Sequence, residues 1–109
     1  MISRTWIGST RRDDADDYLR YLQETGLSDY RTIPGNLGVV VRRSLSSDVA
    51  TFELTSFWES EDAIRRFAGP DIQLARYYPE DDRYLLEKTP HVTHADVIFA
   101  DLPNSIFER

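Results

Sequence analysis

Residues 37–58, LGVVVRRSLSSDVATFELTSFW, are the stretch that decides the fold. Two runs rich in β-branched and aromatic residues, 37–45 and 49–58, are separated by the polar triplet Ser46-Ser47-Asp48. Runs of this composition favour strands, and a short polar connection between them is typical of a hairpin. The sequence therefore predicts an antiparallel hairpin that turns at residues 46–48.

A helix is expected directly after this hairpin. Ser60 is placed to cap it, and the acidic pair Glu61 and Asp62 complements the positive end of the helix dipole. A Gly-Pro pair at residues 69–70 ends it. The residues of its inner face are apolar: Ile64, Phe67 and Ala68.

A longer helix is expected before the hairpin, from the cap residue Thr10 to the terminator Gly26. Its apolar face follows the i, i+3, i+4, i+7 spacing and consists of Ala15, Tyr18, Leu19 and Leu22. Aspartates at positions 13, 14, 16 and 17 crowd its first turns, where an electrostatic role at the helix N-terminus is favoured over metal binding. Residues 27–32 are expected to add a short turn, and residues 71–78 a further short helix.

Strands at residues 2–9 and 91–100 complete the order β-α-β-β-α-β. This order favours a ferredoxin-like α+β fold, with a four-stranded antiparallel sheet and both helices on one face. The acidic stretch PEDDRYLLE, residues 79–87, is expected to be irregular. A chain of 109 residues is short for two domains, so we expect one domain over residues 1–100 and a tail over residues 101–109.

The composition narrows the classes of function. A net charge of −6 and a pI of about 4.8 argue against a nucleic-acid partner, which needs clustered cations. The absence of Cys excludes disulfides, thiolate catalysis and Cys-based zinc sites. No window is apolar enough for a membrane span, and the N-terminus lacks the apolar core of an export signal. We therefore expect no membrane association and a cytoplasmic location.

A second copy of the chain is expected to cover the open face of the sheet. Apolar residues point to both faces of the predicted strands. Val39 and Val41, for example, point to one face, and Val40 points to the other. A sheet that is covered on one side only should instead alternate apolar with polar residues. The sequence therefore predicts a homodimer whose sheets face each other. The apolar residues of the tail are expected to reach across to the partner: Leu102, Ile106 and Phe107.

Two short motifs carry a resemblance to a known family. They are Pro34-Gly35-Asn36 before the second strand and Phe57-Trp58-Glu59-Ser60-Glu61-Asp62-Ala63 at the step from strand to helix. With the element order, they make residues 1–100 resemble the antibiotic biosynthesis monooxygenase family. The resemblance implies a dimeric α+β barrel. The family includes cofactor-free oxygenases of aromatic polyketides, haem-degrading enzymes and many small proteins with no assigned activity, and the resemblance does not choose among them.

Polar residues inside the strands are the candidate site residues. We expect those of the first, third and last strands to converge on the uncovered face, where they would meet a small ligand. They are Arg4, Glu53, Thr55, His94 and Asp96. His94 is predicted to be the general base, because an imidazole takes a proton near neutral pH. Arg4 is predicted to stabilise the resulting oxyanion.

Aromatic side chains are expected to hold the substrate. Trp6, Tyr77 and Tyr78 are predicted to stack on a flat aromatic molecule, while Glu53, Thr55 and Asp96 supply polar contacts. Deprotonation of a phenol or an anthrone-like carbon acid gives an electron-rich anion that reacts with O₂ without a metal. The sequence therefore favours a monooxygenase-like protein with no metal and no cofactor.

Structural interpretations of the same residues stay open. Arg4 and Glu53 are equally explained by a cross-strand ion pair, and His94 by a hydrogen-bonded structural histidine. The alternative function is a non-catalytic dimeric domain that binds a small ligand or acts in a stress response. A cavity of several hundred Å³ would favour the ligand site, and a filled core the alternative.

Haem binding or degradation is a minor alternative. The haem-degrading relatives resemble one another in a Trp in the region of the second helix, a His further along the chain as axial ligand, and an Asn in the first strand. The corresponding positions here hold Phe67, Tyr77 and Trp6. Tyr is able to ligate ferric haem, but all three residues of the pattern are replaced.

Overall fold

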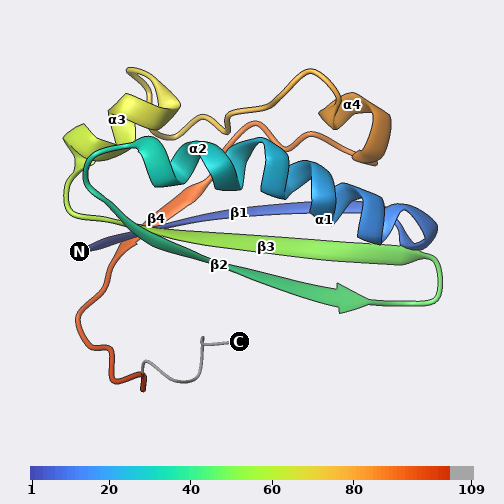
Figure 1. Ribbon diagram of the computed structural model, residues 1–109, viewed down its shortest axis with the longest axis horizontal. Helices are drawn as coiled ribbons and strands as arrows, with labels where there is room; N and C mark the ends of the chain where they lie inside the picture. Colours follow the sequence, from blue (N-terminus) through green and yellow to red (C-terminus); the bar gives the residue numbers. More distant parts are fainter. Residues whose placement is uncertain (104–109) are drawn as a thin grey trace.

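The computed structural model describes residues 1–103. The tail residues Ile106 and Phe107, for which a contact with a partner is expected, lie outside this range. The described elements form one open sheet with helices packed on one of its faces (Figure 1). In chain order they are β1 (Ile2–Arg11), a 3₁₀ turn η1 (Arg12–Asp14), α1 (Ala15–Glu24), α2 (Gly26–Thr32), β2 (Asn36–Leu45), β3 (Val49–Trp58), α3 (Glu61–Ala68), α4 (Asp81–Tyr84) and β4 (Thr93–Asp96).

The four strands are ordered β2-β3-β1-β4, and every neighbouring pair is antiparallel. The two long connections, each containing helices, cross the same face of the sheet, while the other face is bare (Figure 1). This confirms the ferredoxin-like α+β fold. The predicted hairpin is also confirmed, because β2 and β3 pair from Asn36↔Trp58 to Leu45↔Ala50 around a turn at residues 46–48.

The predicted cap of α3 is confirmed, whereas the ends of the first helix are not where the sequence places them. The Ser60 hydroxyl accepts a hydrogen bond from the Ala63 backbone N–H at 3.1 Å. Thr10 does not cap a helix, because β1 continues to Arg11 opposite β3. The first helix breaks at Thr25, and Gly26 begins α2 rather than ending α1.

The later part of the chain differs more from expectation. Residues 71–78 form no helix, because their backbone groups bond to distant segments instead: Ala75 N–H donates to Pro90 C=O, and Val92 N–H donates to Gln73 C=O. The helix of this region is α4, within the stretch expected to be irregular. The last strand covers only Thr93–Asp96 of the predicted residues 91–100.

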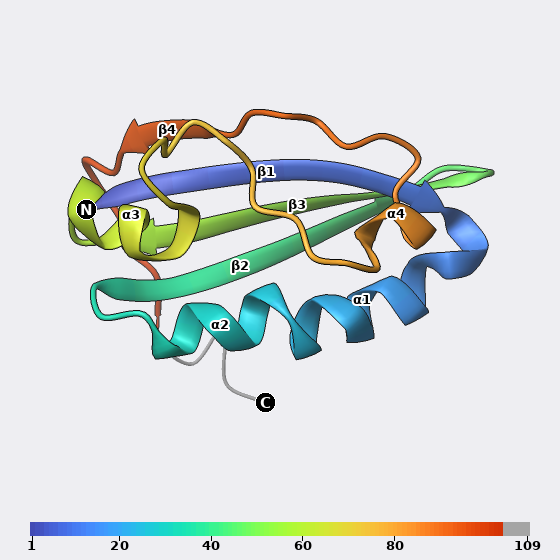
Figure 2. The same ribbon diagram turned by 90° about the horizontal axis from the view of Figure 1, so that it is seen from above.

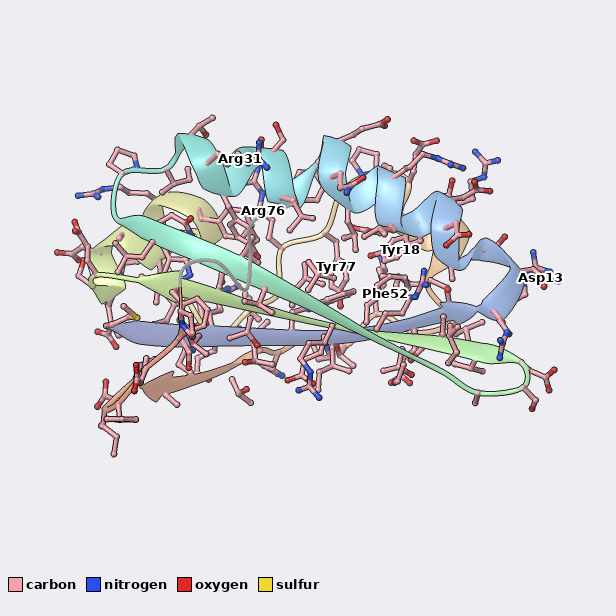
Figure 3. All side chains as sticks on the ribbon, turned by 60° about the horizontal axis from the view of Figure 1, so that its bottom comes forward. Asp13, Tyr18, Arg31, Phe52, Arg76 and Tyr77 are labelled. Atoms are coloured by element: carbon pink, nitrogen blue, oxygen red, sulfur yellow. The ribbon has the colours of Figure 1, made fainter. Side chains whose placement is uncertain are left out.

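Two apolar clusters fill the space between sheet and helices. One packs Tyr18, Leu22 and Phe52 beneath α1, and the other packs Tyr30, Trp58 and Ile64 beneath α2 and α3. Figure 3 shows Tyr18 and Phe52 pointing toward one another in this layer, while Asp13 points to solvent. Residues 69–80 run over β1 and β3 beside the α1–α2 pair (Figure 2). We call these residues the covering segment.

The strand register decides which side chains face the helices. Even-numbered residues of β1 and β3, such as Arg4 and Ser56, lie on the covered face and are mostly buried. The bare face is richer in hydroxyls than expected, since Thr5 bonds Thr55 and Ser9 bonds Thr51 across the strands. The bare face is therefore less apolar than the sequence predicts, although the apolar Ile7 is exposed on it.

Candidate functional site

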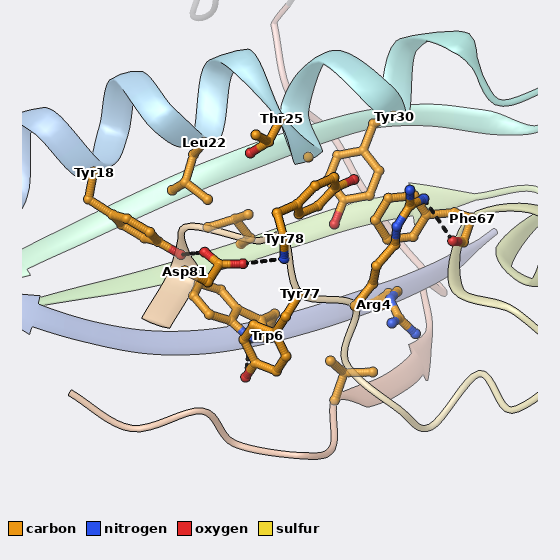
Figure 4. Close-up of a pocket in the computed structure, with 14 residues that line it drawn as sticks. Arg4, Trp6, Tyr18, Leu22, Thr25, Tyr30, Phe67, Tyr77, Tyr78 and Asp81 are labelled. Atoms are coloured by element: carbon orange, nitrogen blue, oxygen red, sulfur yellow. Dashed lines mark hydrogen bonds between the residues drawn. The ribbon is translucent and has the colours of Figure 1, made fainter. Parts of the chain in front are cut away.

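A cavity lies between the sheet, the α1–α2 pair and the covering segment (Figure 4). It is on the covered side of the sheet, not on the bare side where the sequence places the site. Its volume is about 40 Å³. Because one water molecule needs roughly 10–15 Å³ of such space, the cavity has room for about three waters. This is far below the several hundred Å³ expected of a ligand pocket.

Six of the 14 residues that line the cavity are aromatic. They come from the sheet (Trp6), from the helices (Tyr18, Tyr30 and Phe67) and from the covering segment (Tyr77 and Tyr78). The three positions that replace the pattern of the haem-degrading relatives, Phe67, Tyr77 and Trp6, are all among them. The aromatic residues predicted to hold a substrate are therefore brought together.

Trp6 has its position because Gly8 has no side chain. The two residues are on the same face of β1, and a Cβ at Gly8 would overlap the Trp6 indole ring. The indole lies across the strand and donates its N–H to the Tyr77 hydroxyl at 3.1 Å. That hydroxyl in turn donates to Thr89 C=O. Trp6 and Tyr77 are thus a fixed pair in the cavity wall.

Arg4 lines the opposite end of the cavity from Asp81 (Figure 4). It is only 3% exposed, and its guanidinium donates to Ile72 C=O and to Leu74 C=O, the latter at 2.9 Å. Burial lowers the pKa of Arg4, but arginine starts so high that it stays charged. Arg4 therefore brings a buried positive charge to the cavity and also ties down the covering segment.

His94 is next to Arg4 but is not part of the cavity wall. Its Nε2 lies 3.1 Å from Nη1 of Arg4, on the neighbouring strand. Burial and the Arg4 charge lower the pKa of His94, so the ring is neutral at pH 7 and accepts from Arg4. A base for a ligand in this cavity would need to reach it, and His94 faces a guanidinium instead. The predicted catalytic role of His94 stays a prediction, and this geometry weakens it.

Asp81 is the acid of the cavity. Its carboxylate accepts from the Tyr18 hydroxyl at 2.9 Å and from the Tyr78 backbone N–H at 2.7 Å. The residue is 4% exposed, and burial raises its pKa. Burial, and then the contact with Asp81, raise the pKa of Tyr18, which stays protonated as a donor. A buried carboxylate with raised basicity thus faces the aromatic cavity.

A cluster of three side chains joins the covering segment to the helices. The Tyr78 hydroxyl donates to Asp29 at 2.5 Å, and Arg76 lies 3.6 Å from the same carboxylate. The Arg76 guanidinium lies over the rings of Phe67 and Tyr78, about 5 Å from each centre. Figure 3 shows Arg76 directed into the space beneath α2. The covering segment, which forms the roof of the cavity, is therefore held by Arg4 near one end and through Tyr78 near the other.

The other predicted site residues are separated from this group. Glu53 and Thr55 lie on the bare face, so the expected convergence with Arg4 and His94 is wrong. Glu53 pairs with Arg42 at 3.4 Å, not with Arg4, and Thr55 bonds Thr5. Asp96 is exposed at the end of β4, opposite Ile2. The cause is the register, which sets Arg4 opposite Ser56.

Sequence reasoning missed Asp81, Tyr18 and Tyr30 as cavity residues. Asp81 stands in the run Glu80-Asp81-Asp82, which is typical of a solvated segment. The sequence indicates Tyr18 only as part of the buried helix face. Their proximity depends on a fold-back between residues far apart in the chain, and no local signal in the sequence reports it.

Two general properties of the described residues bear on the kind of site. Within residues 1–103, no group of three or more His, Asp or Glu side chains is arranged to hold a metal ion. In the same range, no helix is long and apolar enough to cross a membrane.

Comparison with known proteins places the fold. No family model matches the chain, and no curated protein matches its sequence significantly. Among solved structures, it is similar to a Bacillus cereus protein whose assignment as an antibiotic biosynthesis monooxygenase is itself provisional. The TM-score is 0.61 at 13% identity, over 94% of this chain and 97% of the other.

A second similar structure is that of MhuD, a haem degrader from Mycobacterium tuberculosis with two haems bound in its active site. The TM-score is 0.57 at 18% identity, over 93% of this chain and 99% of the other. The chain therefore has the fold of antibiotic biosynthesis monooxygenase-like proteins, as the sequence resemblance implies. Identities this low establish the shared fold and leave the activity to the residues of the cavity.

Proposed function

We propose that this chain is a monooxygenase-like protein that binds a small aromatic molecule between its sheet and its helices, without metal or flavin. The observation that carries the proposal is the composition of the cavity. Six aromatic side chains surround a space with a buried arginine at one end and a buried carboxylate at the other. Apolar walls with a few polar groups are the usual form of a small-molecule site.

Entry of such a ligand requires the roof to move. The cavity of about 40 Å³ is smaller than a single benzene ring needs, so the covering segment has to swing outward. Residues 69–80 contain neither helix nor strand. Their attachments to β1 and α2 run largely through Arg4, Tyr77 and Tyr78. Swinging the segment outward breaks these side-chain hydrogen bonds and its backbone bonds to residues 90–92, which is a smaller change than unpacking a helix.

We also propose that the protein works as a homodimer joined at the bare sheet face. Ile7 is 51% exposed there. Residues 97–103 leave β4 on the side of the sheet away from the helices (Figure 1), and Ile98 and Phe99 are 94% and 81% exposed. Apolar residues exposed to this extent next to one another favour burial against a partner. A second copy supplies the same surface by symmetry.

Haem does not fit the residues of this cavity. No His is among the residues that line it, and the Tyr77 hydroxyl is already bonded to Trp6 and Thr89. We therefore derive no step through haem.

Anthrone tests the proposal, because its deprotonated form reacts with O₂ without a cofactor. One anthrone and one O₂ give one anthraquinone and one water, so consumption of O₂ reports turnover. We expect the protein to accelerate O₂ consumption and to show a change in Trp6 fluorescence on binding. Binding without acceleration would favour the non-catalytic ligand-binding alternative. The absence of both binding and turnover would contradict the proposal.

A matched variant separates Trp6 from the second tryptophan. Trp58 is fully buried in the other core cluster and does not line the cavity itself, although its ring packs against Tyr30 and Phe67, which do. In Trp6→Phe, the response of the remaining Trp58 fluorescence to anthrone should be much smaller than that of the unmodified protein. An undiminished response in this variant would contradict contact between the ligand and Trp6.

A further inference from the structure

Two charged groups of opposite sign are buried in one cavity without pairing. Among residues 1–103, neither Arg4 nor Asp81 forms a salt bridge, whereas the nine pairs found join other residues. Both residues are more than nine-tenths buried. Figure 4 shows them at opposite ends of the cavity, with Tyr77, Tyr78 and Trp6 between. Buried charges are costly unless they are paired or used.

Asp81 is the better placed of the two buried groups to exchange a proton. Each carboxylate oxygen can accept two hydrogen bonds, and one partner is seen for each. Tyr18 bonds Oδ1, and the Tyr78 N–H bonds Oδ2. Each oxygen can therefore accept one more hydrogen bond, and Asp81 lines the cavity. Burial also raises the pKa of Asp81, which makes it a stronger base than an exposed aspartate.

We propose that Asp81 is the proton acceptor of the cavity and takes the proton of the phenol or carbon acid already considered as substrate. This rests on the proposed function and names its acid–base residue. The C–H or O–H bond of the ligand breaks, and the proton moves to a carboxylate oxygen of Asp81. The electron pair stays on the ligand, where its oxygen carries the charge toward Arg4. No oxidant is needed for this step.

Tyr18 is a positioning residue in this scheme. It reaches Asp81 from α1 and holds Oδ1, so it fixes the carboxylate without touching the ligand's reacting atom. Its hydrogen bond also lowers the pKa of Asp81, against the larger effect of burial. Removing the Tyr18 hydroxyl should therefore raise the pKa of Asp81 further.

Hydrogen–deuterium exchange at the methylene carbon of anthrone, measured by NMR in D₂O under nitrogen, tests the step alone. We expect the protein to accelerate this exchange, with the rate falling as pH falls through the raised pKa of Asp81. Asp81→Asn should lose about 100-fold or more of the acceleration, the usual contribution of a general base. Asp82→Asn is the matched control, because Asp82 is the exposed neighbour of Asp81. This variant should accelerate the exchange of anthrone as much as the unmodified protein does.

The pH profile keeps the test informative if Asp81→Asn folds poorly. In Tyr18→Phe, the midpoint of the exchange profile should move to higher pH, while the rate on the alkaline plateau is kept. A role of Tyr18 in packing alone would lower the amount of folded protein and leave the midpoint unchanged, and this result would contradict its positioning role.

The outcomes separate this inference from the proposed function. Bound anthrone that is not exchanged, or exchange that is equally fast in folded Asp81→Asn, would overturn Asp81 as the proton acceptor and leave ligand binding intact. Failure to bind anthrone at all would overturn both. Exchange under nitrogen without O₂ consumption in air would support Asp81 and contradict the oxygenase activity.

Discussion

The guanidinium of Arg4 joins the sheet to the covering segment and, through the same Nη1 atom, contacts Nε2 of His94 at 3.1 Å. One side chain therefore serves the edge strand β4 and the roof of the cavity at once. The contact depends on the register of β1 and β4, which sets Arg4 directly opposite His94. It makes the roof sensitive to both residues.

Removing the Arg4 guanidinium should loosen the roof. In Arg4→Met, the carbonyls of Ile72 and Leu74 lose their donor. We expect a loss of about 1 to 3 kcal/mol in the free energy of unfolding, since bonds to charged groups contribute roughly 1.5 to 3 kcal/mol each and relief of the buried charge offsets part of this. Urea denaturation measures the loss. Exchange of the Ala75 and Val92 amides should accelerate.

Arg66→Met is the control for this prediction. Arg66 also donates to a carbonyl, that of Pro34, but from an exposed position. Its loss should change stability by well under 1 kcal/mol and leave the two amides protected. Equal effects of the two variants would contradict a special role of Arg4 in holding the roof.

The His94 contact predicts a dependence of stability on pH. The pKa of His94 is lowered in the folded protein by burial and by Arg4, with Glu61 acting weakly in the other direction. The unfolded chain therefore binds a proton first, near pH 6.5, and stability falls as the pH falls below this value toward the folded pKa. His94→Gln keeps an acceptor for Arg4 and should flatten this part of the stability profile.

The exposed His91 provides the comparison. It lies two residues before β4 and its backbone pairs with Leu74, but among residues 1–103 its side chain forms no hydrogen bond to Arg4. His91→Gln should keep the full pH dependence between pH 7.5 and 5.5, as measured by thermal unfolding. An unchanged profile in His94→Gln would mean that other groups, such as carboxylates, account for the dependence.

Local signals were sufficient for the elements whose stability is local. The hairpin of residues 37–58 and the Ser60 cap follow from strand composition, a short polar turn and a hydroxyl beside a helix start. Residues 71–78 carry an apolar spacing that favours a helix. Arg4 and the segment around Pro90 bind their backbone carbonyls and N–H groups instead, and tertiary contacts of this kind override propensity.

The candidate site was predicted only in part, because it depends on register and on long-range folding. Alternation within a strand correctly pairs Arg4 with Trp6, and it separates Glu53 from Leu54. It does not say which of these sets faces the helices. A shift of one residue would exchange the two faces. Asp81 and Tyr18 are 63 positions apart in the sequence, so no local motif predicts their contact.

Adding a methyl group at Gly8 should disturb the cavity from below. A Cβ there overlaps the Trp6 indole, so Gly8→Ala should push the ring into the cavity and break its bond to Tyr77. We expect a loss of about 1 to 3 kcal/mol in the free energy of unfolding, which is typical of overpacking. The Trp6 emission should shift, and anthrone should bind more weakly. Gly26→Ala is the control for stability alone, because its added methyl would meet Tyr78 at an ordinary 3.7 Å, although Gly26 also lines the cavity.

The bare sheet face predicts how the protein associates. Sedimentation at micromolar concentration should show a particle of twice the 12.7 kDa of one chain. Ile7→Lys should convert it to a monomer, because it puts a strongly hydrated charge in the middle of the face. The variant should still fold, since Ile7 lies directly opposite Glu53 and the new ammonium gains a cross-strand partner.

Leu45→Lys controls for the general effect of a lysine on the sheet. Leu45 is also exposed, but it lies directly opposite Ala50, whose side chain faces the helices. Leu45 is therefore on the covered side of the sheet and not on the bare face. This variant should therefore remain a dimer. A 12.7 kDa particle for the unmodified chain would contradict the dimer outright. Loss of the dimer in Leu45→Lys but not in Ile7→Lys would instead move the interface to the edge of β2.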